Sequence, residues 1–175
     1  MNIKHFEKLE STSSTDKEMA EQGVEPWTVI WADEQNAGHG KEGRDWHSSK
    51  GGLYFSVILP KSNIDDLQTI TILAAFITAK VIKNNFSLEP FIKLPNDIWV
   101  NQKKVCGILT ENVIGSDIKL SVIGIGLNTN IEKFSPQLEN AATSIKIETG
   151  QEADNEKILK QIVEGLKEQL KTISQ

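Results

Sequence analysis

The chain has 175 residues, a net charge of −5 and a pI near 5.3, and no run of about 18 apolar residues that would cross a membrane. Its single cysteine, Cys106, excludes an internal disulfide, and the acidic balance disfavours binding along DNA. The N-terminal residues lack the apolar stretch of a secretory signal. We therefore expect one soluble, cytoplasmic domain over residues 1–175, monomeric or homodimeric, that binds neither DNA nor membranes.

The first half of the chain predicts two helices and two strands. Thr15 and Glu18 have the spacing of a capping box, which predicts a short helix that begins at Thr15. Apolar, β-rich runs predict buried strands at 28–32 and 53–59, on either side of a glycine-rich loop. Apolar residues at spacings of three and four then predict a helix over 65–84, with Phe76 widening its buried face.

The second half predicts hairpins followed by a closing helix. Strands at 91–93 and 98–101 flank Pro-Asn-Asp, which is turn chemistry, and strands at 105–113 and 119–128 flank a turn at 114–117. Asp154 is the expected N-cap of the last helix. This succession favours an α/β (α+β) fold, a mixed, largely antiparallel β-sheet covered by helices.

The loop QNAGHGKEGRDWHSS, residues 35–49, is the first candidate binding site. Its three glycines let backbone N–H groups approach an anion, and Lys41 and Arg44 add positive charge. Trp46 offers a stacking face to a base or a cover for a pocket. The local pattern also fits a mobile surface loop with scattered charge, and the spacing is not that of a P-loop.

KLPNDIWVNQKKVCGILTEN, residues 93–112, is the second candidate. A hairpin here brings Asp97 back toward Lys104, where the carboxylate would hold the ammonium or help to hold Mg²⁺. Gly107 within a strand indicates close approach by a ligand or by neighbouring backbone. The alternative is a surface hairpin with solvated lysines. The three histidines have no carboxylate or cysteine at metal-ligand spacing, so we expect no zinc site.

Two further segments carry small or hydroxyl side chains. The hydroxyls of residues 9–21 would cap a helix or also bind a polar ligand group. In IGIGLNTN, residues 123–130, Gly124 and Gly126 leave one face of a strand bare. Such a face admits either a ligand or a closely packed helix, and Asn128 at its end is placed to contact a base or a phosphate.

In this order the segments resemble the catalytic domain of biotin protein ligases. GHGKEGRDW stands where that family has GRGRxGRxW, KLPND where it has KWPND, KVCGIL where it has KxxGIL, and GIGLN where it has GxGxN. Ser14, Thr15 and Asp16 stand where it has S-T-N. The resemblance implies the class II synthetase-like biotin/lipoate ligase fold. We expect neither the N-terminal helix-turn-helix nor the C-terminal SH3-like barrel that relatives carry.

The resemblance also implies a reaction and its residues. The family uses ATP, Mg²⁺ and biotin to make biotinyl-5′-AMP, and transfers biotin to a lysine of a biotin carboxyl carrier protein. Carried over by position, the catalytic residues are Lys104, Lys41, Arg44 and Asp97, with Asp97 also a candidate Mg²⁺ ligand. The biotin-binding residues are Ser14, Thr15, Asp16, Gln35, Gly38, His39, Gly40, Lys104 and Gly107. The ATP- and adenylate-binding residues are Lys41, Arg44, Trp46, Lys93, Asn96 and Asn128.

The chain departs from the family pattern at several of these positions. His39 and Lys41 replace two arginines, and a lysine cannot make the forked contact that arginine makes with phosphate. Asp16 replaces an asparagine and Leu94 a tryptophan.

Two alternatives stay open: a lipoate or octanoate ligase or transferase of the same broad fold, and a non-catalytic protein that binds biotin or biotinyl-AMP. We also expect residues 36–50 to be mobile without ligand, because ordering glycines costs entropy.

Overall fold

The computed structural model describes residues 1–60, 67–114 and 119–173, so most of the predicted turn at 114–117 and the first two residues of the predicted helix at 65–84 lie outside the described residues. The elements, in chain order, are β1 (Asn2–Leu9), α1 (Thr12–Glu21), β2 (Thr28–Gln35), the 3₁₀ turn η1 (Lys41–Gly43), β3 (Leu53–Leu59), α2 (Leu67–Phe86), β4 (Phe91–Lys93), β5 (Asp97–Val100), β6 (Lys103–Ile114), β7 (Lys119–Leu127), α3 (Ile145–Thr149) and α4 (Asn155–Ile173).

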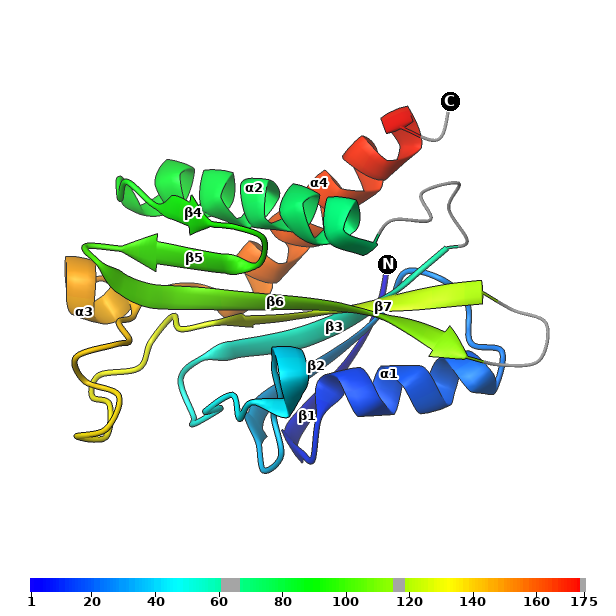
Figure 1. Cartoon of the computed structure of the whole chain (residues 1–175), viewed down its shortest axis with the longest axis horizontal. Helices are drawn as coiled ribbons and strands as arrows, with labels where there is room; N and C mark the ends of the chain where they lie inside the picture. Colours follow the sequence, from blue (N-terminus) through cyan, green and yellow to red (C-terminus); the bar gives the residue numbers. More distant parts are fainter. Residues whose placement is uncertain (61–66, 115–118, 174–175) are drawn as a thin grey trace.

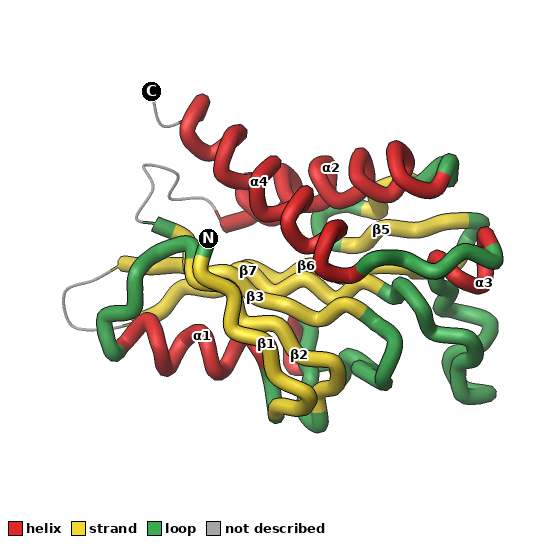
Figure 2. Tube along the Cα trace, turned by 180° about the vertical axis from the view of Figure 1, so that it is seen from behind, coloured by secondary structure: helices red, strands yellow, loops and turns green. Residues whose placement is uncertain are grey.

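The strands of the described residues form one sheet with the order β1-β2-β3-β7-β6-β5-β4. β1 and β2 pair in parallel, and every other neighbouring pair is antiparallel. Helices α2 and α4 cover one side of the sheet and α1 covers the other (Figure 1), and the same layers are visible from behind (Figure 2). The predicted mixed, largely antiparallel sheet covered by helices is therefore confirmed.

The larger hydrophobic core lies between the sheet and the pair α2 and α4. β3 is buried at every residue because it lies in the middle of the sheet and both of its faces are covered. α2 buries Ile70, Ala74 and Ile82 against this core. Phe76 is 60% exposed, so its predicted place on the buried face was wrong. At the helical period of 3.6 residues, Phe76 lies beyond the arc that the sheet and α4 cover.

Helix α1 begins earlier than its predicted start at Thr15. Its N-cap is Ser11, whose hydroxyl accepts a hydrogen bond from the backbone N–H of Ser14 at 3.4 Å. The hydroxyl of Thr15 instead donates to the backbone carbonyl of Ser11 at 3.0 Å, inside the helix. Ser11 supplies the same capping chemistry one turn earlier. As a result the first turn of α1 lies against β7, where a Cβ on Gly124 would collide with the hydroxyl of Ser13.

The hairpin of β5 and β6 and the cap of α4 form as predicted, although Asn101, expected in the strand 98–101, lies in the hairpin turn. Asn101 and Gln102, both with positive φ, form the two-residue turn that joins β5 to β6, as in a type I′ hairpin. Asp154 caps α4, because its carboxylate accepts from the N–H of Lys157 at 3.0 Å. The edge strand β1 and the short helix α3 were not predicted. No helix of the described residues is long and apolar enough to cross a membrane.

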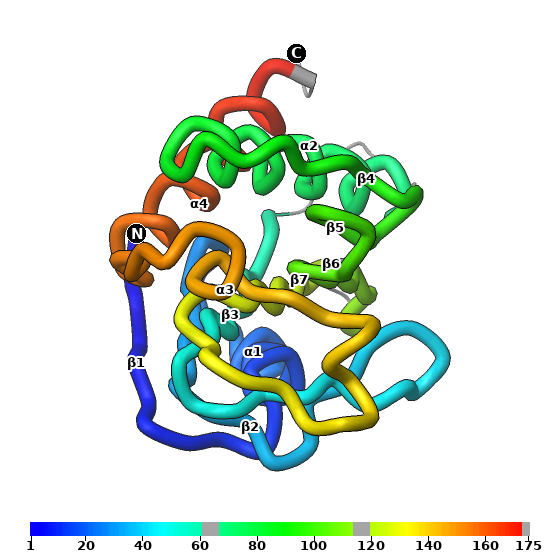
Figure 3. The backbone as a smooth tube through the Cα atoms, turned by 90° about the vertical axis from the view of Figure 1, so that its left-hand side faces the viewer, coloured from blue at the N-terminus to red at the C-terminus, as the bar shows by residue number. Residues whose placement is uncertain are grey.

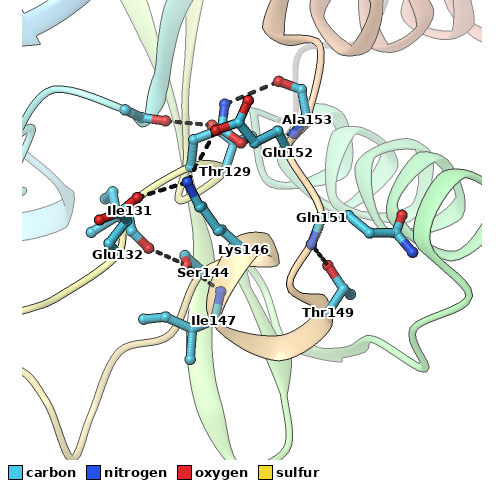
Figure 4. A network of polar contacts seen from close by, with 12 residues as sticks. Thr129, Ile131, Glu132, Ser144, Lys146, Ile147, Thr149, Gln151, Glu152 and Ala153 are labelled. Carbon is cyan, nitrogen blue, oxygen red and sulfur yellow. Dashed lines mark hydrogen bonds and ion pairs between the residues drawn. The ribbon is translucent and has the colours of Figure 1, made fainter.

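A polar network holds the segment that follows β7 (Figure 4). The ammonium of Lys146 in α3 lies 2.7 Å from the carboxylate of Glu132 and 3.0 Å from that of Glu152. The hydroxyl of Ser144 caps α3 by accepting from the N–H of Ile147 at 3.0 Å. These contacts fasten both ends of the segment 132–144, which forms a wall of the candidate site.

Candidate functional site

Two cavities adjoin on the side of the sheet that carries α1. The first, of about 330 Å³, is lined by the start of α1, by the glycine loop (residues 36–50) and by β5, β6 and β7. The second, of about 560 Å³, lies between the same loop and the segment 134–142. Figure 3 shows these two segments, cyan and yellow, side by side. Four residues line both cavities: Gln35, Asp45, Trp46 and Lys104.

Lys104 lies where the two cavities meet. Its ammonium is 2.6 Å from the carboxylate of Asp97, in an ion pair whose angles are not those of a hydrogen bond. The hairpin of β5 and β6 brings the two residues together, as predicted. The backbone N–H of Lys104 donates to the carbonyl of Ala141 at 2.9 Å, and its carbonyl accepts from the N–H of Thr143 at 2.9 Å. The lysine is therefore held through both its backbone and its charge.

Trp46 covers the floor of the site. Gly107 and Gly126 pair across β6 and β7, and a Cβ on either glycine would collide with the indole ring. The ammonium of Lys104 lies 5.1 Å from the ring centroid, within the range of a cation–π contact. The indole N–H is buried with no hydrogen-bond partner among the described residues. The two glycines thus admit an aromatic side chain against the sheet.

The glycine loop folds back on itself as a short hairpin. The N–H of Gly40 donates to the carbonyl of Arg44 at 2.7 Å, and the N–H of Trp46 donates to the carbonyl of Gly38 at 2.8 Å. The guanidinium of Arg44 lies 3.0 Å from the carboxylate of Glu42 at the exposed tip. These hydrogen bonds are the loop's own contacts, and the expectation that residues 36–50 are mobile without ligand stays a prediction.

Most of the predicted site residues line one of the cavities. The first cavity takes Gln35, His39, Gly40, Lys41, Arg44, Trp46, Asn96, Asp97, Lys104 and Gly107. The second takes Gln35, Gly38, Trp46, Lys104 and Asn128.

Of two predicted nucleotide contacts, Asn128 lines the second cavity and Lys93 does not. Lys93 lines neither cavity, and its ammonium lies 4.5 Å from the ring centroid of Trp99 on the neighbouring strand. The amide of Asn128 donates to the carbonyl of Thr143 at 3.0 Å, so it also fastens the segment after β7. Asn96, another predicted nucleotide contact, lines the first cavity and not the second.

The hydroxyl-rich segment contributes other residues than those predicted. Ser11, Thr12 and Ser13 line the first cavity, whereas Ser14, Thr15 and Asp16 line neither cavity. The earlier start of α1 is the reason, because it turns the first residues of the helix toward the cavity. The signal that would have found them is the Ser-Thr pair at 11–12, which fits the same pattern three positions earlier.

Asp16 lies on the buried face of α1, and its side chain is fully buried. Burial penalises the charged carboxylate and raises the pKa of Asp16 to about 7, while nearby Ser56 and Lys4 act in the opposite direction. Neither carboxylate oxygen has a partner in hydrogen-bonding geometry among the described residues, the Ser56 hydroxyl included. Asp16 is therefore a buried acid behind the site rather than a ligand contact.

The wall of the second cavity was missed by sequence reasoning. It consists of residues in the segment after β7, namely Phe134, Ser135, Gln137, Leu138, Ala141 and Ala142. No periodic pattern marks them, because the segment has no strand and is held through the backbone of Lys104 in β6.

The described residues offer neither a preformed metal site nor a reactive thiol. No group of three or more His, Cys, Asp or Glu within the described ranges is arranged to hold a metal ion, and Asp97 is engaged by Lys104. Cys106 is buried in the core, and burial raises the pKa of its thiol well above the usual range. A buried thiol that holds its proton is a poor nucleophile.

Comparisons with known proteins agree with this geometry. The chain is 36% identical over 160 residues to the bifunctional ligase/repressor BirA of Bacillus subtilis, covering 89% of the chain and 49% of the relative. It is 30% identical over 160 residues to the biotin–[acetyl-CoA-carboxylase] ligase of Paracoccus denitrificans, covering 86% and 67%. The chain thus spans about half, 49%, of the length of the BirA protein.

Solved structures are similar over almost the whole chain. The biotin protein ligase of Aquifex aeolicus in complex with biotin and ATP has a TM-score of 0.89 and 29% identity, covering 99% of this chain and 72% of that one. The Leishmania major enzyme in complex with biotinyl-5-AMP has a TM-score of 0.79 and 25% identity, covering 94% and 73%. Residues 6–128 match the model of the biotin/lipoate A/B protein ligase family, and the chain belongs to that family.

Proposed function

We propose that this chain is an ATP-dependent biotin–protein ligase. It makes biotinyl-5′-AMP and then transfers biotin to a lysine of a biotin carboxyl carrier domain. The observation that carries the proposal is the place of Lys104, paired with Asp97 at the junction of two cavities. Relatives of similar fold have been solved with biotin and ATP. Biotin in the first cavity and adenosine in the second would bring carboxylate and α-phosphate together at Lys104.

In the first step, a carboxylate oxygen of biotin attacks the α-phosphorus, and the bond to the bridging oxygen of pyrophosphate breaks. Both reactants are anions, so the ammonium of Lys104 lowers their repulsion and stabilises the charge that builds up at the phosphorus. Asp97 keeps the ammonium in one position, which limits the reorganisation needed during the reaction. Lys41 and Arg44 line the first cavity and add positive charge near the leaving group.

In the second step, the neutral amine of the acceptor lysine attacks the carbonyl carbon of the mixed anhydride. AMP leaves with the electron pair of the broken C–O bond, and the new amide loses its extra proton to solvent. The enzyme forms no covalent bond in either step. The glycine loop lines the first cavity and Trp46 covers its floor, so together they would limit the access of water to the anhydride.

The polar groups of the first cavity favour biotin over a plain acyl chain. Thr12, Ser13 and Gln35 offer donors and acceptors that suit a ureido ring. Mg²⁺ usually reaches such sites on the phosphates of ATP, with few ligands from the protein. Asp97 is ion-paired with Lys104 and stays the candidate protein ligand of Mg²⁺, and no group of three or more His, Cys, Asp or Glu among the described residues is arranged to hold a metal ion.

The test is to incubate the protein with ATP and, in parallel, biotin, lipoate or octanoate, and to look for each adenylate by mass spectrometry. A biotin carboxyl carrier domain is then added. Biotinyl-5′-AMP followed by a biotinylated acceptor lysine is the expected result. An adenylate from lipoate or octanoate alone would reassign the substrate. Tight binding of biotin with no adenylate would make the chain a non-catalytic binding protein.

A further inference from the structure

Ser48 is a buried serine, only 5% exposed, whose hydroxyl joins two parts of the wall of the site. It accepts a hydrogen bond from the carboxamide nitrogen of Gln35 at 2.8 Å and donates one to the carbonyl of Trp46 at 3.2 Å. At its other end, the carboxamide oxygen of Gln35 accepts from the N–H of Thr12 at 2.8 Å. A continuous path therefore runs from the first turn of α1 through Gln35 and Ser48 to the glycine loop.

The chemistry of the groups fixes the direction of each bond in this path. A serine hydroxyl has one proton, and the carbonyl of Trp46 can only accept it, so the oxygen of Ser48 accepts from Gln35. The backbone N–H of Thr12 can only donate, so it requires the carboxamide oxygen. Both anchors thus select the same orientation of Gln35. That orientation leaves one N–H and one lone pair of the carboxamide for a ligand.

The packing around Gly38 shows how closely these parts are coupled. A Cβ on Gly38 would lie 2.6 Å from the hydroxyl oxygen of Ser48, 2.8 Å from the carbonyl oxygen of Trp46 and 2.9 Å from the amide nitrogen of Gln35. The backbones of Gln35 and Ser48 also pair, through an N–H to carbonyl bond of 3.2 Å. The loop therefore cannot shift at Ser48 without disturbing the carboxamide.

We propose that Ser48 is a positioning residue of the activation reaction, which orients Gln35 toward the ligand of the first cavity and ties the glycine loop to it. Where it concerns biotin, this inference rests on the proposed function. Ser48 lines the second cavity but not the first, so its effect on biotin passes through Gln35.

A double-mutant cycle tests whether Ser48 acts through Gln35. The biotin dissociation constants of Ser48→Ala, Gln35→Ala and the double variant are measured by titration calorimetry. Each single change should weaken biotin binding about tenfold, as the loss of one or two hydrogen bonds would. The double variant should bind no more weakly than Gln35→Ala alone. Additive losses would overturn the proposal, because residues that act together are not additive.

Two further variants separate hydrogen bonding from packing. Ser48→Cys fills nearly the same space with a much weaker hydrogen-bonding group, so it should bind biotin as weakly as Ser48→Ala. Wild-type affinity in Ser48→Cys would make the role one of packing and would overturn the proposal. Ser49→Ala is the matched control, since the hydroxyl of Ser49 makes no hydrogen bond within the described residues, and it should bind biotin normally.

Ligand-free measurements decide the part of the proposal that does not need biotin. Hydrogen exchange at the amide of Trp46 should be faster in Ser48→Ala than in wild type or Ser49→Ala, with unchanged thermal unfolding. Unchanged exchange would contradict the link to the loop. A wild-type protein that does not bind biotin would overturn the proposed function. Hydrogen exchange at the amide of Trp46 would still show whether Ser48 ties the glycine loop to Gln35. A change in ATP half-saturation alone would reassign Ser48 to a nucleotide contact and overturn the proposal.

Discussion

The ammonium of Lys104 and the carboxylate of Asp97 lie 2.6 Å apart at the point where two cavities meet. The pair is a quarter exposed, at 28% and 23% of the two side chains, so it faces an open site rather than the core. This arrangement holds the lysine in place, yet within reach of ligands from both sides.

Lys104→Ala should lower the rate of adenylate formation about 10²- to 10³-fold, because it removes the positive charge where two anions meet. Pyrophosphate release with biotin and ATP measures the rate. Lys103→Ala is the matched control: Lys103 contacts the carbonyl of Glu139 and lines neither cavity, so its loss should leave the rate unchanged. A near-normal rate from folded Lys104→Ala would remove the residue from this role.

Gly126→Ala should move Trp46 off the floor of the site, since a Cβ there collides with the indole. The emission of Trp46 should shift to the red as the ring becomes more exposed, and adenylate formation should fall. In a Trp46→Phe background the same glycine change should produce no emission shift. A shift that persists without Trp46 would mean that another tryptophan reports the change.

Lys41→Arg should slow the escape of biotinyl-5′-AMP, because a guanidinium makes a forked contact with phosphate where an ammonium makes a single-point contact. Dissociation of the preformed adenylate is followed together with labelling of an unrelated bystander protein. The variant should release more slowly and label less. Lys50→Arg, outside both cavities, should match the wild type. Equal release from Lys41→Arg and the wild type would place Lys41 away from the phosphate.

Asp16 should make the protein less stable as pH rises. Its pKa is raised by burial from 3.8 to about 7, so the folded protein binds a proton more tightly than the unfolded chain does. The free energy of unfolding should therefore fall between about pH 4 and pH 7 and level off above, by on the order of 1–4 kcal/mol.

Denaturant unfolding at pH 5 and pH 8 measures this effect. Asp16→Asn, which cannot ionise, should gain stability relative to the wild type on going from pH 5 to pH 8. Glu21→Gln on the exposed end of the same helix should follow the wild type at both values. Parallel changes in the wild type and Asp16→Asn would show that Asp16 is not the buried acid responsible.

The sequence alone determined much of the framework and part of the site. The buried strands at 28–32 and 53–59, the long helix of the middle segment and the cap at Asp154 follow from apolar period and local hydrogen bonding, which act over a few residues. The approach of Asp97 to Lys104 was also local, because a two-residue turn joins their strands.

Contacts between distant segments decided the rest. Ser11 and Thr15 have equivalent capping chemistry, so only the packing of α1 on β7 decided which one begins the helix and which hydroxyls line the first cavity. Phe76 is exposed because the sheet and α4 cover only one arc of α2. The wall of the second cavity has no periodic signal, since backbone contacts of Lys104 with Ala141 and Thr143 hold it in place. Such contacts depend on the order of strands in the sheet, which local patterns do not specify.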